Sequence, residues 1–413
     1  MRGETRLNEP AARIQHRCPQ CGAPAELIES DRWLRCAYCR VSSCIVPGDV
    51  VRYLLGAPRA VDDGGAGRDD RLIWFPYWRL RGTILLLTHD GGISYRHVDA
   101  TIAALGVPAF PAGLGVRPEA MPLRFVSPET PGRFIRAGVT SGEAMRVFAR
   151  RFAADTTAER HDFIGESLSL IYAPYRVGLP GAPRGLADLL TGHPAGGELD
   201  PDTEATLPAE PAPPAGVNFI PAICPRCGGS LDGERAAVAF RCAPCGVSWS
   251  AGPRGFEAIE EAHLDDDIAA PVFLPFWCFD AGGHAYWTPA MKLRPPVFFR
   301  LAASLTLRPP DHLASGAPPP AHGTAASDGA ASFVVPTLGP DEAAASAVWV
   351  AAFLHGSPRG LLTALGSLQS RGAQAPLRPR LVRVPFSKAT LQYENAAREL
   401  AIEQSAVSMG KEM

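Results

Sequence analysis

The segment CPQCGAPAELIESDRWLRCAYC, residues 18–39, decides the fold of the first part of the chain, and CPRCGGSLDGERAAVAFRCAPC, residues 224–245, follows the same plan. In each segment, fourteen residues separate two Cys-x2-Cys pairs. Four soft thiolates at this spacing suit a tetrahedral zinc ion, because each short loop bends the backbone around the metal. The sequence therefore predicts two structural zinc sites. Their ligands are Cys18, Cys21, Cys36, Cys39, Cys224, Cys227, Cys242 and Cys245.

Other residues around the cysteines support the same interpretation. Gly22 and Gly228 follow the second cysteine of their pairs, where the turn requires a positive φ. Residues 26–28 and 33–35 flank a polar tripeptide and predict a short hairpin, and residues 237–241 are the returning strand expected in the second copy. These features resemble zinc ribbons with rubredoxin-like knuckles.

Several alternatives concern the cysteines. A redox Cys-x2-Cys motif would be one isolated pair near a βαβ pattern, which matched sets of four do not fit. Iron remains open, because four thiolates hold either metal. The ribbons can act as structural staples or as recognition surfaces, and we favour the staple. Cys44 and Cys278 have no partner at ligand spacing, and such cysteines usually behave as small hydrophobes.

Landmarks outside the ribbons also occur twice in the same order. The segments 72–78 and 272–277 are apolar and aromatic with a central proline, and 170–175 and 381–386 are a second such pair. Between the two aromatic segments of each half, the sequence predicts a helix. In the first half the helix follows the capping box of Thr140 and Glu143, and in the second half it begins at Pro340. We interpret this order as an internal duplication. The expected fold is α+β, with two units that each contain a zinc ribbon followed by a β-rich body and a packed helix.

Composition changes along the chain predict the domain boundaries. The expected parts are ribbon 1 (1–52), body 1 (71–190), a Pro/Ala/Gly-rich linker (191–217), ribbon 2 (218–256) and body 2 (270–405), with a flexible loop near 309–332. The linker should be extended and unpacked, and the connectors after the ribbons should let each ribbon move. A short apolar stripe predicts a helix within 387–413.

Charge and hydropathy limit the classes of function. The 413 residues include 40 basic and 42 acidic side chains, for a net charge of −2, which argues against a surface devoted to nucleic acid or anionic lipid. No segment is apolar for the length that a membrane span needs, and no secretory signal is recognised. We therefore expect a cytoplasmic protein with reduced cysteines and no membrane span.

No common catalytic motif occurs in the sequence, and four cysteines per metal leave no open position for substrate. The leading hypothesis is a non-enzymatic zinc-binding adaptor or scaffold whose partner is another protein. The first alternative is nucleic-acid binding through the ribbons or through Arg-rich stretches at 133–160 and 371–388, which can equally be solvated faces or contacts to acidic connectors. The second alternative is an enzyme whose site forms only on folding.

The paired ribbons are followed by Phe75-Pro76-Tyr77-Trp78 in one half and Leu274-Pro275-Phe276-Trp277 in the other. This combination resembles a group of uncharacterised bacterial proteins with tandem four-cysteine zinc ribbons. The resemblance implies zinc at the eight cysteines named above, and it implies no activity.

Overall fold

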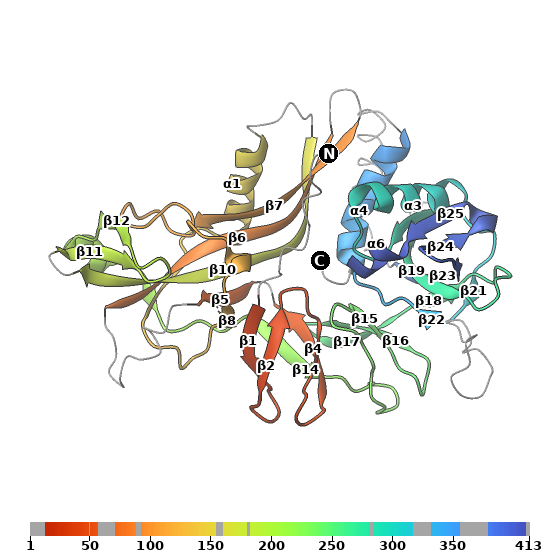
Figure 1. Cartoon of the computed structure of the whole chain (residues 1–413), viewed down its shortest axis with the longest axis horizontal. Helices are drawn as coiled ribbons and strands as arrows, with labels where there is room; N and C mark the ends of the chain where they lie inside the picture. The colour runs from red at the N-terminus through yellow and green to blue at the C-terminus, as the bar shows by residue number, and fades with distance from the viewer. Residues whose placement is uncertain are drawn as a thin grey trace.

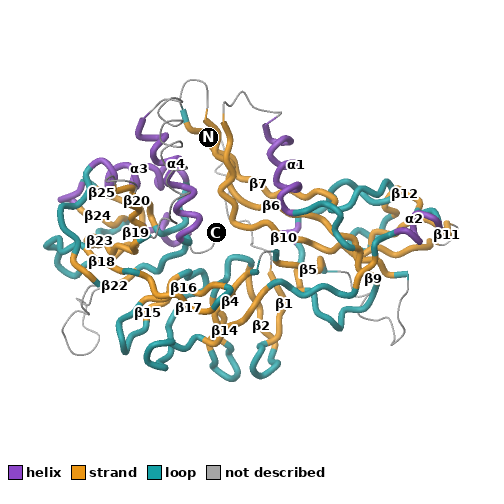
Figure 2. The backbone as a smooth tube through the Cα atoms, turned by 180° about the vertical axis from the view of Figure 1, so that it is seen from behind, coloured by secondary structure: helices purple, strands orange, loops and turns teal. Residues whose placement is uncertain are grey.

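The computed structural model describes residues 13–48, 50–56, 71–87, 92–153, 160–179, 182–280, 285–316, 332–355 and 379–409. Two sheet-based bodies lie side by side, and the two ribbons lie together along one side of the pair (Figure 1). The main helices lie on the opposite side, as the view from behind also shows (Figure 2). No helix in the described residues is long and apolar enough to cross a membrane.

Body 1 is built on an eleven-stranded sheet with the order β13-β9-β6-β10-β5-β8-β1-β2, in which β7 pairs with β6, β11 with β10, and β12 with β11. The first two strands of ribbon 1 therefore belong to the same sheet as body 1. The bounds are β1 Arg13–Arg17, β2 Pro24–Ile28, β5 Val51–Leu55, β6 Leu72–Leu87, β7 Ile93–Ala103, β8 Leu123–Phe125, β9 Arg133–Ile135, β10 Arg160–Leu179, β11 Ala182–Asp188, β12 Pro194–Glu198 and β13 Ala209–Glu210. The helices of this half are α1 (Ser141–Ala153) and α2 (Pro201–Thr206).

Body 2 is built on an eight-stranded sheet with the order β20-β19-β23-β18-β21, to which β22, β24 and β25 are attached. The bounds are β18 Glu261–His263, β19 Val272–Asp280, β20 Ala285–Pro289, β21 Ala314–Ser315, β22 Ser332–Phe333, β23 Arg380–Lys388, β24 Gln392–Asn395 and β25 Leu400–Glu403. Its helices are α3 (Pro295–Leu307), α4 (Pro340–His355) and α6 (Gln404–Met409).

Two small sheets form the rest of the ribbons. In one, β14 (Val217–Pro221) pairs with β4 (Ser42–Pro47), which pairs with β3 (Trp33–Arg35). In the other sheet, β16 (Ser248–Gly252) is the central strand and pairs antiparallel with β15 (Ala239–Arg241) and with β17 (Gly255–Ile259). Because β14 enters from the second half of the chain, the two ribbons are joined by backbone hydrogen bonds.

The central strands of the two bodies pair in the same register. In body 1, Trp78 of β6 lies opposite Leu170 of β10, and in body 2, Trp277 of β19 lies opposite Leu381 of β23. The indole of Trp78 donates to the carbonyl of Val139 at 2.8 Å, and that of Trp277 donates to Leu338 at 2.9 Å. Each acceptor lies just before a helix, α1 or α4, so the same bond fixes the start of each helix over its sheet.

The prolines of these strands lie where a strand changes its partner. β6 pairs with β9 through Trp74 and with β7 from Tyr77, so Pro76 lies between the two partner strands. Pro275 has the same place in β19, between the residues that pair with β22 and those that pair with β20. A proline there costs no ladder bond, because no partner strand faces its missing N–H group.

The aromatic segments form the cores, as the sequence predicts. Trp74, Phe134, Phe148 and Tyr172 are fully buried in one cluster of body 1, and Phe148 comes from α1. In body 2, Trp277 and Trp349 lie in a single large cluster with residues of α3 and of the C-terminal strands. Leu85 and Leu87 of β6 belong to the same cluster, so the end of this long strand packs against body 2.

Three expectations for local structure are wrong. The predicted hairpin of residues 26–28 and 33–35 does not form: β2 pairs with β1 and β3 pairs with β4, because each Cys-x2-Cys loop is itself the turn of a hairpin. The linker is not unpacked: it contains β12, α2 and β13, and its Leu199 and Leu207 are buried. The C-terminal helix is mainly a hairpin, β24 and β25, followed by the short α6.

The helix α3 was not predicted, although it begins at Pro295, a favoured first position. The flexible loop expected near 309–332 falls mostly outside the described residues, since 317–331 are not described.

Candidate metal centres

Each Cys-x2-Cys loop is the tip of a small hairpin. The strands β1 and β2 enclose Cys18–Cys21, β3 and β4 enclose Cys36–Cys39, and β15 and β16 enclose Cys242–Cys245. The fourth loop, Cys224–Cys227, lies between Ile223 and Ser230, which form an isolated bridge. Two such tips therefore face each other in each ribbon.

All four loops have the same backbone hydrogen bonds. The N–H of the residue after the second cysteine donates to the carbonyl of the first cysteine, as Gly22 does to Cys18 at 2.8 Å. That residue has a positive φ in every loop, and the four are Gly22 (71°), Arg40 (61°), Gly228 (73°) and Gly246 (71°). The sequence indicated two of these positions. Gly246 and Arg40 were missed, and Arg40 could not be recognised because it is not a glycine.

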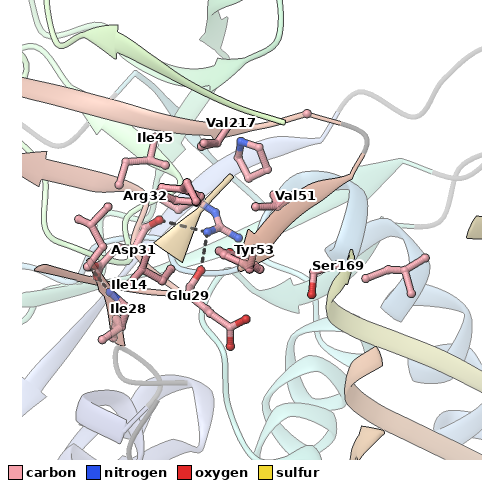
Figure 3. Close-up of a pocket in the computed structure, with 15 residues that line it drawn as sticks. Ile14, Ile28, Glu29, Asp31, Arg32, Ile45, Val51, Tyr53, Ser169 and Val217 are labelled. Atoms are coloured by element: carbon pink, nitrogen blue, oxygen red, sulfur yellow. Dashed lines mark hydrogen bonds between the residues drawn. The ribbon is translucent and has the colours of Figure 1, made fainter. Parts of the chain in front are cut away.

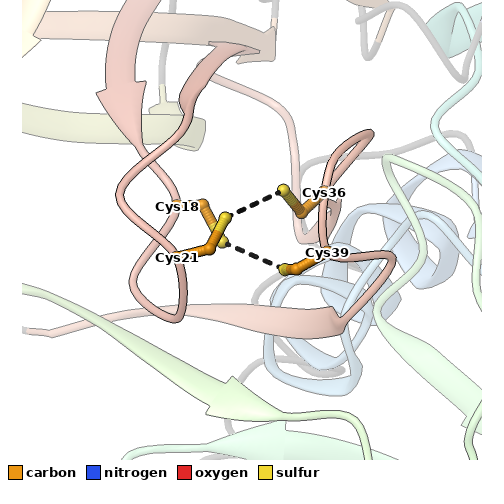
Figure 4. Close-up of side chains that lie close together, drawn as sticks. All are labelled: Cys18, Cys21, Cys36 and Cys39. Carbon is orange, nitrogen blue, oxygen red and sulfur yellow. Dashed lines mark hydrogen bonds between the residues drawn. The ribbon is translucent and has the colours of Figure 1, made fainter.

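The four sulfur atoms of each ribbon lie within 4.8 Å of one another, so each set could hold one metal ion. In ribbon 1 the Sγ–Sγ distance is 3.8 Å between Cys18 and Cys39 and 3.7 Å between Cys21 and Cys36 (Figure 4). In ribbon 2 the Sγ–Sγ distance is 3.6 Å between Cys224 and Cys245 and 3.4 Å between Cys227 and Cys242. A tetrahedron with zinc–sulfur bonds of about 2.3 Å has edges of about 3.8 Å. A disulfide, at about 2.05 Å, would be far shorter. The residues present therefore fit a tetrahedral metal ion.

The pKa values of Cys36 and Cys39 in ribbon 1 are shifted in opposite directions. Backbone N–H groups of Cys39 and Tyr38 lower the pKa of Cys36 to about 6. The N–H of Val41 also lowers the pKa of Cys39, but burial and the neighbouring sulfur atoms raise it to about 12. Four thiolates cannot gather without a cation, and a divalent metal supplies the charge that holds them together.

The same order of burial occurs in both clusters. The first cysteine of each pair is buried, namely Cys18, Cys36, Cys224 and Cys242. Cys21 and Cys227 are exposed, and the remaining two are intermediate. Each metal centre is therefore closed on the side of the protein and faces solvent at the tips of the ribbon.

The two ribbons share an apolar interface away from the metal ligands. Trp33 of ribbon 1 stacks on Phe240 of ribbon 2 with ring centroids 5.2 Å apart. Cys44 is fully buried in the same cluster, and burial raises the pKa of its thiol to about 12. Asp31 of ribbon 1 accepts two hydrogen bonds from Arg235 of ribbon 2, at 2.9 and 2.6 Å. Cys44 thus acts as a core residue between the ribbons.

Each ribbon is also tied to its body by buried polar contacts, which sequence reasoning did not find. Glu29 of ribbon 1 contacts Arg79 of β6 at 2.7 Å, and this Arg79 is fully buried. In the second half, the ion pair of Glu261 with Arg383, at 2.7 Å, lies within the sheet of body 2, and Ser248 of β16 in ribbon 2 donates to Glu261 at 2.6 Å. Such buried contacts hold each ribbon against its body, contrary to the expectation that the connectors let the ribbons move.

The environment of Arg79 contains three carboxylates. Besides Glu29, Arg79 contacts Asp99 of β7 at 2.6 Å and Glu119 at 3.6 Å. Burial, followed by a hydrogen bond with Asp99, raises the pKa of Glu119 to about 7. No sequence motif marks this group, because its members come from four separate segments.

Part of the Arg-rich stretch at 371–388 contacts acidic residues of the same chain. Arg380 pairs with Glu260 at 2.6 Å, and Arg383 pairs with Glu261. Arg371 and Arg378 lie outside the described residues. The contacts that are described agree with the alternative in which these arginines bind the acidic connector.

Comparisons of the chain with protein-family models, with curated proteins and with solved structures find no match. The assignment of the metal centres therefore rests on geometry. Within the described part of the chain, the two four-cysteine sets are the only groups of three or more potential ligand residues whose ligand atoms come together in this way.

Proposed function

We propose that the protein is a non-enzymatic, zinc-stabilised scaffold that binds another protein. The observation that carries this proposal is the position of the two four-cysteine clusters. They lie in a pair of ribbons that contact each other. Ribbon 1 is tied to body 1 by the buried ion pair of Glu29 and Arg79, and ribbon 2 is tied to body 2 by the hydrogen bond from Ser248 to Glu261. Metal binding in the ribbons would then fix the two bodies relative to each other.

Zinc is the metal that we propose for both sites. Four thiolates favour zinc or iron, and the Sγ–Sγ distances suit a single ion. With all four positions filled by cysteine, such an ion stabilises the fold and offers no site for substrate or water. We therefore assign both ions a structural role.

Metal analysis of the purified chain tests this part. We expect two zinc ions per chain by mass spectrometry of the metal, and one per chain in Cys36→Ser and in Cys242→Ser. Cys44→Ala is the matched control, because Cys44 is buried nearby but belongs to neither cluster. Iron in place of zinc, or fewer than one metal per chain, would contradict the assignment.

Exposed apolar residues at the ribbon tips support a protein partner. Tyr38 is 69% exposed and Val41 is 39% exposed in ribbon 1, and Ile223 is 54% exposed in ribbon 2. The N–H of Ala222 donates to the carbonyl of Ser42, which brings the chain at Ile223 alongside the chain at Val41. We propose that Tyr38, Val41 and Ile223 together form one apolar surface, of a kind that marks interaction sites when it is contiguous.

This surface can be tested by crosslinking. A photoreactive residue at position 38 should capture a defined protein, and the double substitution Val41→Ser and Ile223→Ser should abolish the capture. Leu391→Ser is the control, since Leu391 is 78% exposed but belongs to body 2. Equal capture in all variants would exclude the ribbon tips as the docking surface.

Nucleic-acid binding remains the second candidate, because ribbon 1 exposes three arginines, Arg17, Arg35 and Arg40, and one large aromatic side chain, Tyr38. Arginines contact phosphates, and an exposed aromatic ring can stack on a base. In gel shifts with single-stranded and double-stranded probes, replacing the three arginines by glutamine should reduce both affinity and its dependence on salt. Arg254→Gln in ribbon 2 is the control. No binding at low salt would reject this candidate.

We also propose that the two halves arose by duplication of one unit. The support is the common register of the central strands and the equivalent indole hydrogen bonds. The resemblance to bacterial proteins with tandem zinc ribbons belongs to the same proposal.

A further inference from the structure

A pocket with a volume of about 220 Å³ lies where ribbon 1 meets the sheet of body 1 (Figure 3). Ribbon 1 contributes Glu29 and Arg32 to its wall, β5 contributes Tyr53, and β10 contributes Ser169. Val217, the first residue of β14, closes another side. The wall therefore combines segments that are far apart in the sequence.

Ser169 provides the first indication of a ligand. Its side chain is 1% exposed, and its Oγ atom has no hydrogen-bond partner within the described part of the chain. A buried hydroxyl without a partner costs free energy in the folded state, so natural proteins rarely keep one. A polar group of a bound molecule would supply the partner.

The charges in the wall indicate the sign of that group. Both oxygens of Glu29 face arginines, Arg79 at 2.7 Å and Arg81 at 3.5 Å. Asp31 is likewise paired, with Arg235. The lining acids are thus already neutralised by cations of the protein.

Arg32 differs from these acids. Its Nη1 donates to the backbone carbonyls of Glu29 and Asp31, each at 3.1 Å, and no carboxylate pairs with it among the described residues. The pocket wall also contains the phenol of Tyr53. The charge available to a ligand is therefore positive.

The rest of the wall is apolar. It is formed by Ile14, Leu27, Ile45, Val51, Phe125 and Leu168, together with a few neighbours. A guanidinium offers a planar pair of donors that matches a carboxylate. The volume lies below the roughly 300–1,000 Å³ of sites for drug-sized ligands, so only a small molecule fits.

We propose that this pocket binds a small carboxylic acid, with its carboxylate on Arg32 and Ser169 and its short apolar tail against the ribbon and the sheet. The site is separate from the metal ligands and goes beyond the scaffold role. A ligand here would contact ribbon 1, body 1 and β14 at once, and would favour the arrangement in which they meet.

Calorimetry with hexanoate on the zinc-loaded full chain tests the proposal. Hexanoate should bind with a dissociation constant in the millimolar range or below. Two matched probes have the same tail: 1-hexanol lacks the charge and hexylammonium has the opposite charge. Both should bind at least tenfold more weakly. Equal binding of the three probes, or no binding of hexanoate, would overturn the proposal.

Three variants locate the site. Arg32→Gln should weaken hexanoate binding at least tenfold, and Ser169→Ala should weaken it several-fold while leaving unfolding of the free protein almost unchanged, because no hydrogen bond is lost. Leu168→Trp should block the pocket and abolish binding while it keeps both polar groups. Arg254→Gln is the control for charge.

Zinc content is measured on the same samples, so that loss of the fold is distinguished from loss of the pocket. If Arg32→Gln does not fold, Ser169→Ala and Leu168→Trp still decide the question. Hexanoate affinity that is unchanged in these two variants would place the acid elsewhere and refute the proposal.

Discussion

The indoles of Trp78 in body 1 and Trp277 in body 2 each donate a hydrogen bond to a backbone carbonyl just before a helix. The residue that follows the tryptophan, however, is Arg79 in body 1 and Cys278 in body 2. In body 1, the buried arginine on β6 holds Glu29 of ribbon 1. In body 2, the buried arginine is Arg383 on the neighbouring strand β23, and it pairs with Glu261 of the same sheet, which accepts from Ser248 of ribbon 2. The direct ion pair between body and ribbon in the first half is thus replaced by a hydrogen bond to an acid of the body in the second half, while the backbone pairing is the same.

This difference distinguishes the contacts that both halves share from the contacts that differ between them. The common register and the prolines at the partner changes specify the sheet. The contact between ribbon and body can be a direct ion pair, as at Glu29, or a hydrogen bond to an acid of the body, as at Glu261. Backbone and apolar contacts therefore determine the common architecture, and the polar contacts determine how firmly each ribbon is attached.

The largest expected effect comes from removing one metal ligand in each half. Ribbon 1 should tolerate Cys36→Ser better than ribbon 2 tolerates Cys242→Ser, because β1 and β2 remain in the large sheet while β15, β16 and β17 form a sheet of their own. Zinc binding contributes about 10–16 kcal/mol to the folding of small zinc domains. Hydrogen exchange should show loss of protection throughout β15, β16 and β17 in Cys242→Ser, but continued protection of residues 13–28 in Cys36→Ser.

Cys44→Ala is the control for this pair, since it removes a buried thiol from the ribbon interface without removing a ligand. It should keep both metals and nearly normal exchange. Equal loss of protection in both ribbons for both ligand variants would contradict the expectation that ribbon 1 is held by its body more firmly than ribbon 2.

The next effect concerns the two buried arginines. Arg79→Met leaves Glu29 and Asp99 without their main cation, and breaking a buried pair in this way costs about 3–5 kcal/mol. Arg383→Met should cost less, because Glu261 keeps its hydrogen bond from Ser248. Urea unfolding of the zinc-loaded protein measures both changes. Arg308→Met, which breaks an exposed pair with Glu399, should change stability by less than about 1 kcal/mol. A larger loss for Arg383→Met than for Arg79→Met would reverse our ranking of the two arginines.

The pH dependence of stability should have opposite signs at two acids. Burial and Asp99 raise the pKa of Glu119 from 4.5 to about 7. The folded state therefore holds a proton that the unfolded state releases, so this contribution is complete below about pH 4.5 and is lost as the pH rises through about 7. For Asp266 in the second half, burial raises the pKa, but hydrogen bonds from Arg398 and Asn395 lower it below 3.8 overall. Its contribution is present above that pH and is lost on acidification.

Unfolding measured from about pH 2 to about pH 8 tests these signs. Glu119→Gln should remove about 1–3 kcal/mol of the decline between pH 4.5 and 7, because an amide does not titrate. Asp266→Asn should flatten only the acid limb below about pH 4. Glu129→Gln is a suitable control, since Glu129 is exposed. An unchanged decline in Glu119→Gln would mean that another group titrates there.

The cysteine loops and the aromatic strands were the parts of the molecule that the sequence predicted well. A metal loop is encoded by adjacent residues, and both ligand sets come together as expected. The helix after Thr140 was also predicted correctly, because its capping box is local: Glu143 accepts from the N–H of Thr140 at 2.8 Å. Local chemistry decides these elements without help from the rest of the chain.

The remaining features depend on contacts over long sequence distances. The linker was expected to be unpacked because it is rich in proline, but Leu199 and Leu207 are buried against body 1, and β13 pairs with β9. Arg79 and its three acids, and the pocket at Ser169, are assembled from several segments. A single sequence shows the residues but not which of them meet.

The smallest expected effect concerns the backbone conformation of the second Cys-x2-Cys loop in each ribbon. Arg40 and Gly246 occupy the same position after the last cysteine of their ribbons, with φ of 61° and 71°. A left-handed conformation costs a residue with a side chain about 1–2 kcal/mol, whereas glycine adopts it freely but loses more entropy on folding. Arg40→Gly should therefore raise stability by about 0.5–1 kcal/mol, and Gly246→Ala should lower it by about 1 kcal/mol, in thermal unfolding of the zinc-loaded chain. Gly252→Ala is the control, because Gly252 has no positive φ and its added Cβ meets no close neighbour. If Arg40→Gly is destabilising, the guanidinium of Arg40 must contribute to ribbon 1 more than its backbone costs, and the two loops would then be equivalent in shape but not in the source of their stability.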